Sequence, residues 1–103
     1  MVAVADLNPE ALHEVSSRFN VSRCVTDYRV LLEDRAIHAI AICVPVPFNF
    51  EIALAALDAG KHVFIEKPLT LTLSECDRLL ERAAGLPLQV MVGFNIRWHR
   101  LAQ

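Results

Sequence analysis

Residues 59–69, Ala-Gly-Lys-His-Val-Phe-Ile-Glu-Lys-Pro-Leu, constrain the fold of this chain more than any other segment. A helical pattern ends at Gly60, an apolar strand follows, and the strand leads directly into Glu66, Lys67 and Pro68. Strands that alternate with helices predict a parallel sheet, and ligands bind at the carboxyl ends of the strands of such sheets. The sequence therefore predicts a ligand-binding edge at which the Lys67 ammonium is placed for proton transfer.

The rest of the chain continues this alternation of strands and helices. Two uninterrupted apolar runs, residues 2–5 and 39–44, are typical of strands buried on both faces of a parallel sheet. Asn8-Pro9 predicts a helix start, Gly60 a helix end, and Thr72 with Glu75 a capping box. Further strands are expected at residues 23–26, 62–65 and 88–92, and helices at 27–34, at 49–59 and after Thr72. The helix after Thr72 should bury Cys76, Leu79, Leu80 and Ala83.

Composition favours one compact domain and excludes several classes of partner. The chain has 103 residues, 54% of them hydrophobic and 21% charged, which suits a globular domain. A net charge of -2 argues against a nucleic-acid partner or an acidic membrane surface. No apolar run reaches the roughly 18 residues of a membrane span, and no signal peptide is recognisable. Three cysteines without a C-x-x-C pair favour a cytoplasmic protein with buried thiols.

Four segments together resemble the N-terminal domain of the Gfo/Idh/MocA family, named after glucose–fructose oxidoreductase, inositol dehydrogenase and a rhizopine-catabolism protein. They are residues 2–10, residues 26–28, residues 51–68 and residues 91–95, and the Ala-Gly-Lys-His-Val-x-x-Glu-Lys-Pro string is the specific one. The resemblance implies that residues 1–103 form part of an NAD(P)-binding Rossmann domain. It also implies hydride transfer to or from a hydroxyl or carbonyl group of a sugar- or cyclitol-like substrate.

The resemblance gives roles to residues that also have simpler interpretations. Asp6, after the second strand of a dinucleotide fold, would bind the adenosine ribose and favour NAD over NADP, or would only cap the following helix. Lys67 would orient the substrate hydroxyl and transfer its proton, or would be a solvated lysine. Glu66 and Pro68 would shape the cofactor pocket, and the Lys67–Pro68 peptide bond is a candidate for the cis form.

The segment after the strand at residues 39–44 departs from the family pattern. Pro45 matches and would lie along the cofactor, whereas Val44 and Val46 stand where polar residues are expected. Asn49 stands where relatives have histidine and cannot titrate near neutrality, and it would also contact the cofactor. Asn95 and Arg97 follow the last strand, where they would contact the substrate. The four histidines have no metal-ligand spacing, so no metal is expected.

Two parts of a complete dehydrogenase are not recognisable in the sequence. The glycines, Gly60, Gly85 and Gly93, are too far apart for the Gly-x-Gly-x-x-Gly turn that binds pyrophosphate. The first strand, expected between residues 2–5 and 39–44 in the sheet, and the C-terminal substrate domain are also missing from the pattern. We therefore expect weak NAD binding, no turnover by the chain alone, and a homo-oligomer formed through exposed strand edges.

Three functional interpretations remain open from the sequence. The first is a fragment of an NAD(P)-dependent oxidoreductase. The second is a non-catalytic Rossmann-like module for assembly or small-ligand binding, so whether the chain is itself an enzyme stays undecided. The third, an unrelated flavodoxin-like or receiver-type domain, does not explain Glu66-Lys67-Pro68 at the end of its strand.

Overall fold

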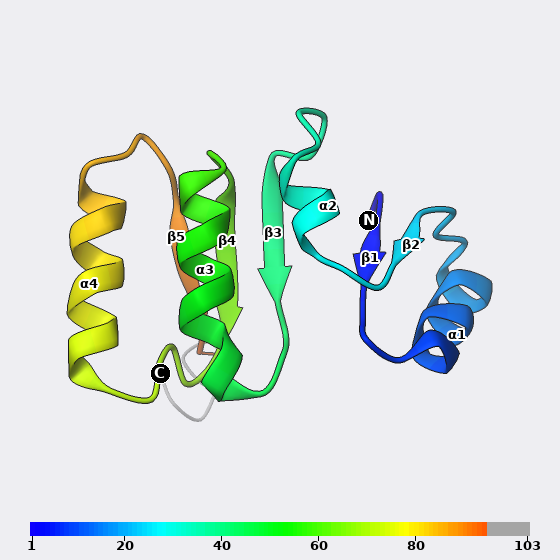
Figure 1. The fold of residues 1–103 in the computed structure, drawn as a ribbon, viewed down its shortest axis with the longest axis horizontal. Helices are drawn as coiled ribbons and strands as arrows, with labels where there is room; N and C mark the ends of the chain where they lie inside the picture. Colours follow the sequence, from blue (N-terminus) through cyan, green and yellow to red (C-terminus); the bar gives the residue numbers. More distant parts are fainter. Residues whose placement is uncertain (95–103) are drawn as a thin grey trace, which may run out of the picture. The chain divides into compact units, whose positions relative to one another are not determined.

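The computed structural model describes residues 1–94, and its elements divide into two compact units. The first unit comprises residues 1–37 and the second begins at His38. The strands of each unit pair only with one another among the described residues, as a two-stranded sheet, β1-β2, and a three-stranded sheet, β3-β4-β5. Figure 1 labels the helices and strands of the two units.

The first unit is a short parallel β-α-β segment followed by one helical turn. Its elements are β1 (Val4–Ala5), α1 (Pro9–Phe19), β2 (Cys24–Val25) and α2 (Arg29–Leu32). The Asn8 side chain caps α1 by accepting a hydrogen bond from the Glu10 backbone N–H at 2.9 Å. Pro9 then occupies the first helical position, as the sequence predicts.

Five apolar side chains of the first unit are buried. They are Leu12, Val21, Leu31, Leu32 and Ile37. Arg23, which precedes β2, forms an ion pair with Asp34, which follows α2. Helix α1 ends at Asn20 in the left-handed region, with φ of 52°, a conformation that asparagine adopts more readily than most residues.

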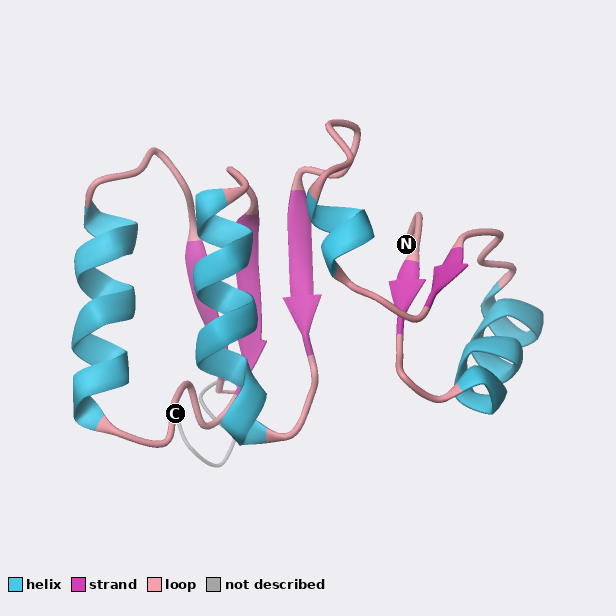
Figure 2. Cartoon of the chain, viewed as in Figure 1, coloured by secondary structure: helices cyan, strands magenta, loops and turns pink. Residues whose placement is uncertain are grey.

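The second unit is a parallel sheet with two helices, and it carries most of the sequence-predicted site. In chain order it contains β3 (Ala39–Ile42), the 3-10 turn η1 (Val46–Phe48), α3 (Asn49–Asp58), β4 (His62–Glu66), α4 (Leu73–Ala84) and β5 (Val90–Gly93). All three strands run in the same direction, with β4 in the middle (Figure 2). Their carboxyl ends therefore lie at one edge of the sheet.

The ends of the helices in the second unit follow the sequence signals closely. Gly60, after α3, has φ of 74°, the left-handed conformation that closes helices and favours glycine. At the start of α4 the Thr72 hydroxyl accepts from the Glu75 N–H at 3.2 Å, and the Glu75 carboxylate accepts from the Thr72 N–H at 3.2 Å. The predicted capping box is thus confirmed.

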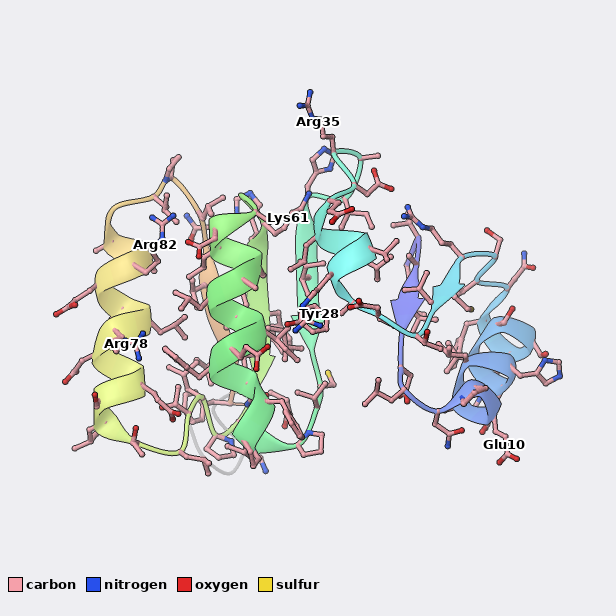
Figure 3. All side chains as sticks on the ribbon, viewed as in Figure 1. Glu10, Tyr28, Arg35, Lys61, Arg78 and Arg82 are labelled. Atoms are coloured by element: carbon pink, nitrogen blue, oxygen red, sulfur yellow. The ribbon has the colours of Figure 1, made fainter. Side chains whose placement is uncertain are left out.

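Helices α3 and α4 pack against each other through apolar and charged contacts. Leu57 of α3 and Leu79 of α4 are each 1% exposed. Arg78 and Arg82 extend from α4 toward α3 (Figure 3), where the Arg78 guanidinium lies over the Phe50 ring and Arg82 Nε is 2.6 Å from Asp58 Oδ1. The Arg82–Asp58 ion pair and the Arg78 guanidinium are exposed to solvent, so the buried leucines supply most of the packing energy.

Four expectations about burial are wrong. The apolar run at residues 2–5 is not buried on both faces, since Val2 is 71% exposed and Val4 and Ala5 are only half-buried. Ala39 and Ala41 of β3 are exposed although a strand buried on both faces was expected, because exposure alternates along the strand and only the face that includes Ile42 is fully packed. Cys43 was expected to be buried but is exposed for the same reason: it follows buried Ile42, and successive side chains along an extended segment point to opposite faces. Leu80 is 55% exposed because only the Leu79 side of α4 is in contact with the core.

The α/β class with parallel strands and flanking helices is confirmed. Several strands are shorter than expected or shifted by a residue or two, and β4 extends one residue further, to Glu66. Within residues 1–94 every helix is too short or too polar to traverse a bilayer.

Candidate functional site

The carboxyl edge of the β3-β4-β5 sheet brings together five of the sequence-predicted site residues. Glu66 is the last residue of β4 and is half-buried, and Lys67 and Pro68 follow it into solvent. The Lys67–Pro68 peptide bond is cis, as the sequence suggested. Pro45 lies just beyond β3 at the same edge, and Asn49 begins α3. The edge thus presents an exposed ammonium group directly beyond the central strand.

Pro45 lies in the connection between β3 and α3, where it is exposed to solvent. Its carbonyl oxygen accepts a hydrogen bond from the Phe48 N–H at 3.0 Å, which closes the 3-10 turn η1. This turn directs the chain from the end of β3 into α3. The pyrrolidine ring of Pro45, with no N–H of its own, leaves an apolar surface there.

Asn49 is buried beneath the turn that carries Lys67. The side chain is 2% exposed, and its Nδ2 donates to the Pro68 carbonyl oxygen at 2.9 Å and to the Glu66 carbonyl oxygen at 3.4 Å. Its Oδ1 has no hydrogen-bond partner among the described residues. Asn49 is therefore part of the scaffold of this edge, in contact with the backbone of the residues predicted to form the site.

Gly93 is a site residue that the sequence analysis did not assign. It pairs with Glu66 across the β4–β5 ladder, and a Cβ atom built on Gly93 would lie 2.5 Å from Glu66 Oε2 and 3.0 Å from Phe64 Cζ. The absence of a side chain at Gly93 leaves room for the Glu66 carboxylate above β5. A glycine inside an apolar strand is the signal for such a close approach, and it was present in the sequence.

We expect Gly93→Ala to displace the Glu66 side chain. The crowded atoms, Glu66 Oε2 and Phe64 Cζ, are the ends of side chains that can move, so the free energy of unfolding should fall by no more than about 1 kcal/mol, the low end of the cost of overpacking. NMR chemical shifts of the Glu66 side chain and denaturant unfolding measure the two effects. Gly85→Ala is the matched control, since its Cβ would meet only Arg82 O at 3.8 Å and Gly85 has negative φ, so it should leave the Glu66 signals unchanged. Unchanged Glu66 signals in Gly93→Ala would contradict the close approach.

Asp6 belongs to the first unit and follows β1 at the carboxyl end of that strand. Its backbone N–H donates to the Val25 carbonyl at 3.2 Å, and its Oδ1 accepts from the Asn8 N–H at 2.8 Å. The carboxylate therefore makes the local loop contact that the simpler interpretation predicted, and it remains exposed to solvent.

Asn95 and Arg97, the predicted substrate contacts, lie outside the described residues. Within residues 1–94, no group of three or more His, Cys, Asp or Glu side chains is arranged to hold a metal ion. His62 has a structural contact, since its Nδ1 accepts from the Gln89 N–H at 3.0 Å and joins the start of β4 to the segment before β5.

The described side chains at this edge can contact a polar ligand. The exposed Lys67 ammonium and the Glu66 carboxylate held over Gly93 can each form hydrogen bonds with polar groups of a substrate or cofactor. Pyrophosphate binding relies on closely spaced glycines, and the three glycines of the chain are isolated from one another. The residues present therefore offer polar contacts to a dinucleotide but no recognisable pyrophosphate-binding turn.

Comparisons with known proteins identify the family to which the chain belongs. Residues 1–94 match the family model described as "Oxidoreductase family, NAD-binding Rossmann fold". The myo-inositol 2-dehydrogenase of Thermotoga maritima is 32% identical over 100 residues, which is 97% of this chain and 30% of that protein. The levoglucosan dehydrogenase of Pseudarthrobacter phenanthrenivorans is 36% identical over 94 residues, which is 91% of this chain and 24% of that protein.

Solved structures share the fold as well as the sequence. A levoglucosan dehydrogenase in complex with NADH superposes with a TM-score of 0.87 at 35% identity, covering 93% of this chain and 26% of that one. A 3-ketoreductase from Actinomadura kijaniata, in complex with NADP, gives a TM-score of 0.88 at 31% identity over 96% of this chain and 30% of that one. The chain thus spans about 30% or less of the length of these relatives. The match over residues 1–94 establishes that the chain belongs to the Gfo/Idh/MocA oxidoreductase family and carries its NAD(P)-binding Rossmann fold.

Proposed function

We propose that this chain forms part of the cofactor-binding and proton-transfer site of an NAD(P)-dependent dehydrogenase that acts on a sugar- or cyclitol-like substrate. The observation that carries the proposal is the exposed Lys67 directly beyond the central strand of a parallel sheet, within the family-matched segment. Relatives named for myo-inositol and levoglucosan support the substrate class. We treat residues 1–103 as part of one dinucleotide-binding domain.

In this proposal Lys67 orients the substrate hydroxyl and transfers its proton. A bound nicotinamide dinucleotide supplies the hydride acceptor or donor. The Lys67 ammonium donates a hydrogen bond to the reacting oxygen, and the neutral amine can take up a proton from it. Glu66 and Pro68 shape the pocket beside Lys67, and Pro45 provides an apolar surface along the cofactor. Asn95 and Arg97 are proposed to contact the substrate.

Asp6 is proposed to select between the two nicotinamide dinucleotides. A carboxylate after this strand accepts hydrogen bonds from ribose hydroxyls and repels a 2′-phosphate, so it favours NAD over NADP. Related structures contain either NADH or NADP, which leaves the choice to residues such as this one. The exposure of Asp6 supports access by a ligand.

The experiment that tests the proposed function uses a chimera that supplies the rest of a dehydrogenase. Residues 1–94 replace the matching segment of the Thermotoga maritima myo-inositol 2-dehydrogenase, and the first strand and glycine-rich turn of that enzyme are kept. We expect NAD-dependent oxidation of a cyclitol, followed by absorbance of the reduced cofactor. A folded chimera that binds NADH without any turnover would contradict the proposal.

The alternative is a non-catalytic Rossmann-like module that serves assembly or ligand binding. Valines at positions 44 and 46 in place of polar residues, and a buried Asn49 that cannot titrate near neutrality, favour this alternative. Cofactor binding without hydride transfer in the chimera would be its signature.

Three free cysteines, one of them exposed, support a reducing compartment such as the cytoplasm.

We also propose that the 103-residue chain alone forms a homo-oligomer. Strands β3 and β5 are the outer strands of their sheet, and unpaired strand edges promote pairing with another chain. Sedimentation velocity should give a species heavier than the 11.5 kDa monomer. A single monomeric species across a concentration series would contradict this proposal.

A further inference from the structure

Asn49 joins the start of α3 to both sides of the turn that carries Lys67. Its Nδ2 lies 2.9 Å from the Pro68 carbonyl oxygen and 3.4 Å from the Glu66 carbonyl oxygen. These two residues flank Lys67 in the sequence. One amide group therefore restrains the backbone on both sides of Lys67.

The orientation of the Asn49 amide follows from its neighbours. Both are carbonyl oxygens, which only accept hydrogen bonds, so the amino group must face them and the amide oxygen must point away. That oxygen, Oδ1, is buried and has no partner among residues 1–94. A buried acceptor without a donor destabilises a protein, and an apolar side chain of the same size would avoid that cost. Packing alone therefore does not account for an asparagine at this position.

Among residues 1–94, few other contacts hold this turn in place. Pro68 has no N–H, and both Lys67 and Pro68 are exposed to solvent. Helix α3, by contrast, is anchored to the rest of the unit by Ala53 and Ala56, both fully buried, and by Leu57. Asn49 thus links an exposed turn to a firmly packed helix.

We propose that Asn49 is a positioning residue, which fixes Lys67 at the carboxyl edge of β4 by donating to the carbonyl groups on either side of it. The side chain is 2% exposed and its amino group faces the backbone of the turn, so this role needs no contact with a cofactor. The function of Lys67 rests on the proposed function above, whereas the restraint of its backbone does not.

The first test measures the hydrogen bond in the unmodified 103-residue chain by NMR. In isotopically labelled protein, we expect a through-hydrogen-bond scalar coupling between Asn49 Nδ2 and the Pro68 carbonyl carbon, together with slow exchange of the Asn49 side-chain amide protons. Absence of the coupling, with fast exchange of these protons, would overturn the proposal without any variant being needed.

The second test compares backbone order in three variants of the same chain. Asn49→Leu keeps the size of the side chain but has no donor, and we expect the order parameter of the Lys67 amide to fall from about 0.85 to below about 0.6. The amides of Val63 and Ile65 should be unchanged. Asn49→His keeps one N–H donor and should restore part of the order at Lys67.

Leu57→Ala is the matched control, because Leu57 is a buried residue near the other end of α3 from Asn49. It should lower the unfolding midpoint without loosening Lys67. Equal mobility of Lys67 in Leu57→Ala and Asn49→Leu would show general loosening and overturn the proposal, as would an unchanged Lys67 amide in Asn49→Leu.

In the chimera, Asn49→Leu should lower kcat about tenfold and leave the KM for NAD within about twofold, an effect of about 1.4 kcal/mol on the barrier. If the chimera has no activity, the proposed function fails while the NMR result still decides the role of Asn49.

Discussion

Lys67→Met in the chimera should lower kcat for cyclitol oxidation by about 10²–10⁴-fold, the usual contribution of a positioned acid–base group. Methionine has a similar length to lysine but cannot carry a proton, so the substrate hydroxyl loses its proton acceptor. The position supports this role, since Lys67 is exposed directly beyond β4, the central strand of the sheet. Steady-state kinetics at saturating NAD measure the change.

Two controls separate proton transfer from charge and from general damage. Lys67→Arg keeps the positive charge but does not deprotonate near neutrality, so kcat should fall while the KM for substrate stays close to that of the parent chimera. Arg35→Ala removes an exposed cation of the first unit (Figure 3) and should leave both constants unchanged. Activity within about threefold of the parent in Lys67→Met would contradict a role for Lys67 in the chemical step, because such a factor is far below the range for acid–base catalysis.

Leu79→Ala should lower the free energy of unfolding of the 103-residue chain by about 2–5 kcal/mol. Leu79 is 1% exposed, where α4 packs against the core of the second unit. Truncation removes buried methyl groups and leaves a cavity that the neighbouring helix and strands cannot fill. Domains of this size are stable by roughly 5–15 kcal/mol in total, so the loss is large. Urea unfolding followed by circular dichroism measures it.

Leu80→Ala is the same substitution one residue along the same helix. Leu80 is 55% exposed, so its truncation should change the free energy of unfolding by no more than about 0.5 kcal/mol. Equal losses in the two variants would mean that α4 does not present its Leu79 side to the core. The pair therefore tests the packing of α4 with helix propensity held constant.

Local sequence signals predicted the beginnings and ends of the helices because each acts over a few residues. Asn8 caps α1, Gly60 takes the left-handed conformation after α3, and Thr72 with Glu75 forms the capping box of α4. At each helix end, either a capping side chain accepts a hydrogen bond from a backbone N–H, or a glycine takes the left-handed conformation that closes the helix. Both effects act locally and do not depend on the rest of the chain. The parallel arrangement followed from the alternation of elements and the family resemblance.

Burial of particular faces was harder to predict from the sequence. Ala39, Ala41, Cys43 and Leu80 are apolar or weakly polar, and the sequence analysis placed them in the core. Their exposure depends on which elements pack beside them, and periodicity does not contain that information. Leu79 and Leu80 illustrate the point, since both fit the apolar stripe of α4 and only one contacts the core.

The sequence predicted those features of the candidate site that depend on where a strand ends. It did not predict those that depend on contacts between elements distant in the sequence. The position of Lys67 follows from the strand that precedes it and the parallel sheet. The Asn49 contacts with Glu66 and Pro68 join residues 17 and 19 positions apart, and the fit of the Glu66 carboxylate over Gly93 depends on the β4–β5 register. Such contacts are set by tertiary structure, so the sequence indicated only the residue types.

A crystal structure of the chimera with bound NADH tests the central placement most directly. If the end of β4 is the reactive edge, the nicotinamide ring will lie beside the Lys67 ammonium. A well-ordered nicotinamide ring bound away from the carboxyl end of β4, with Lys67 facing bulk solvent, would contradict it.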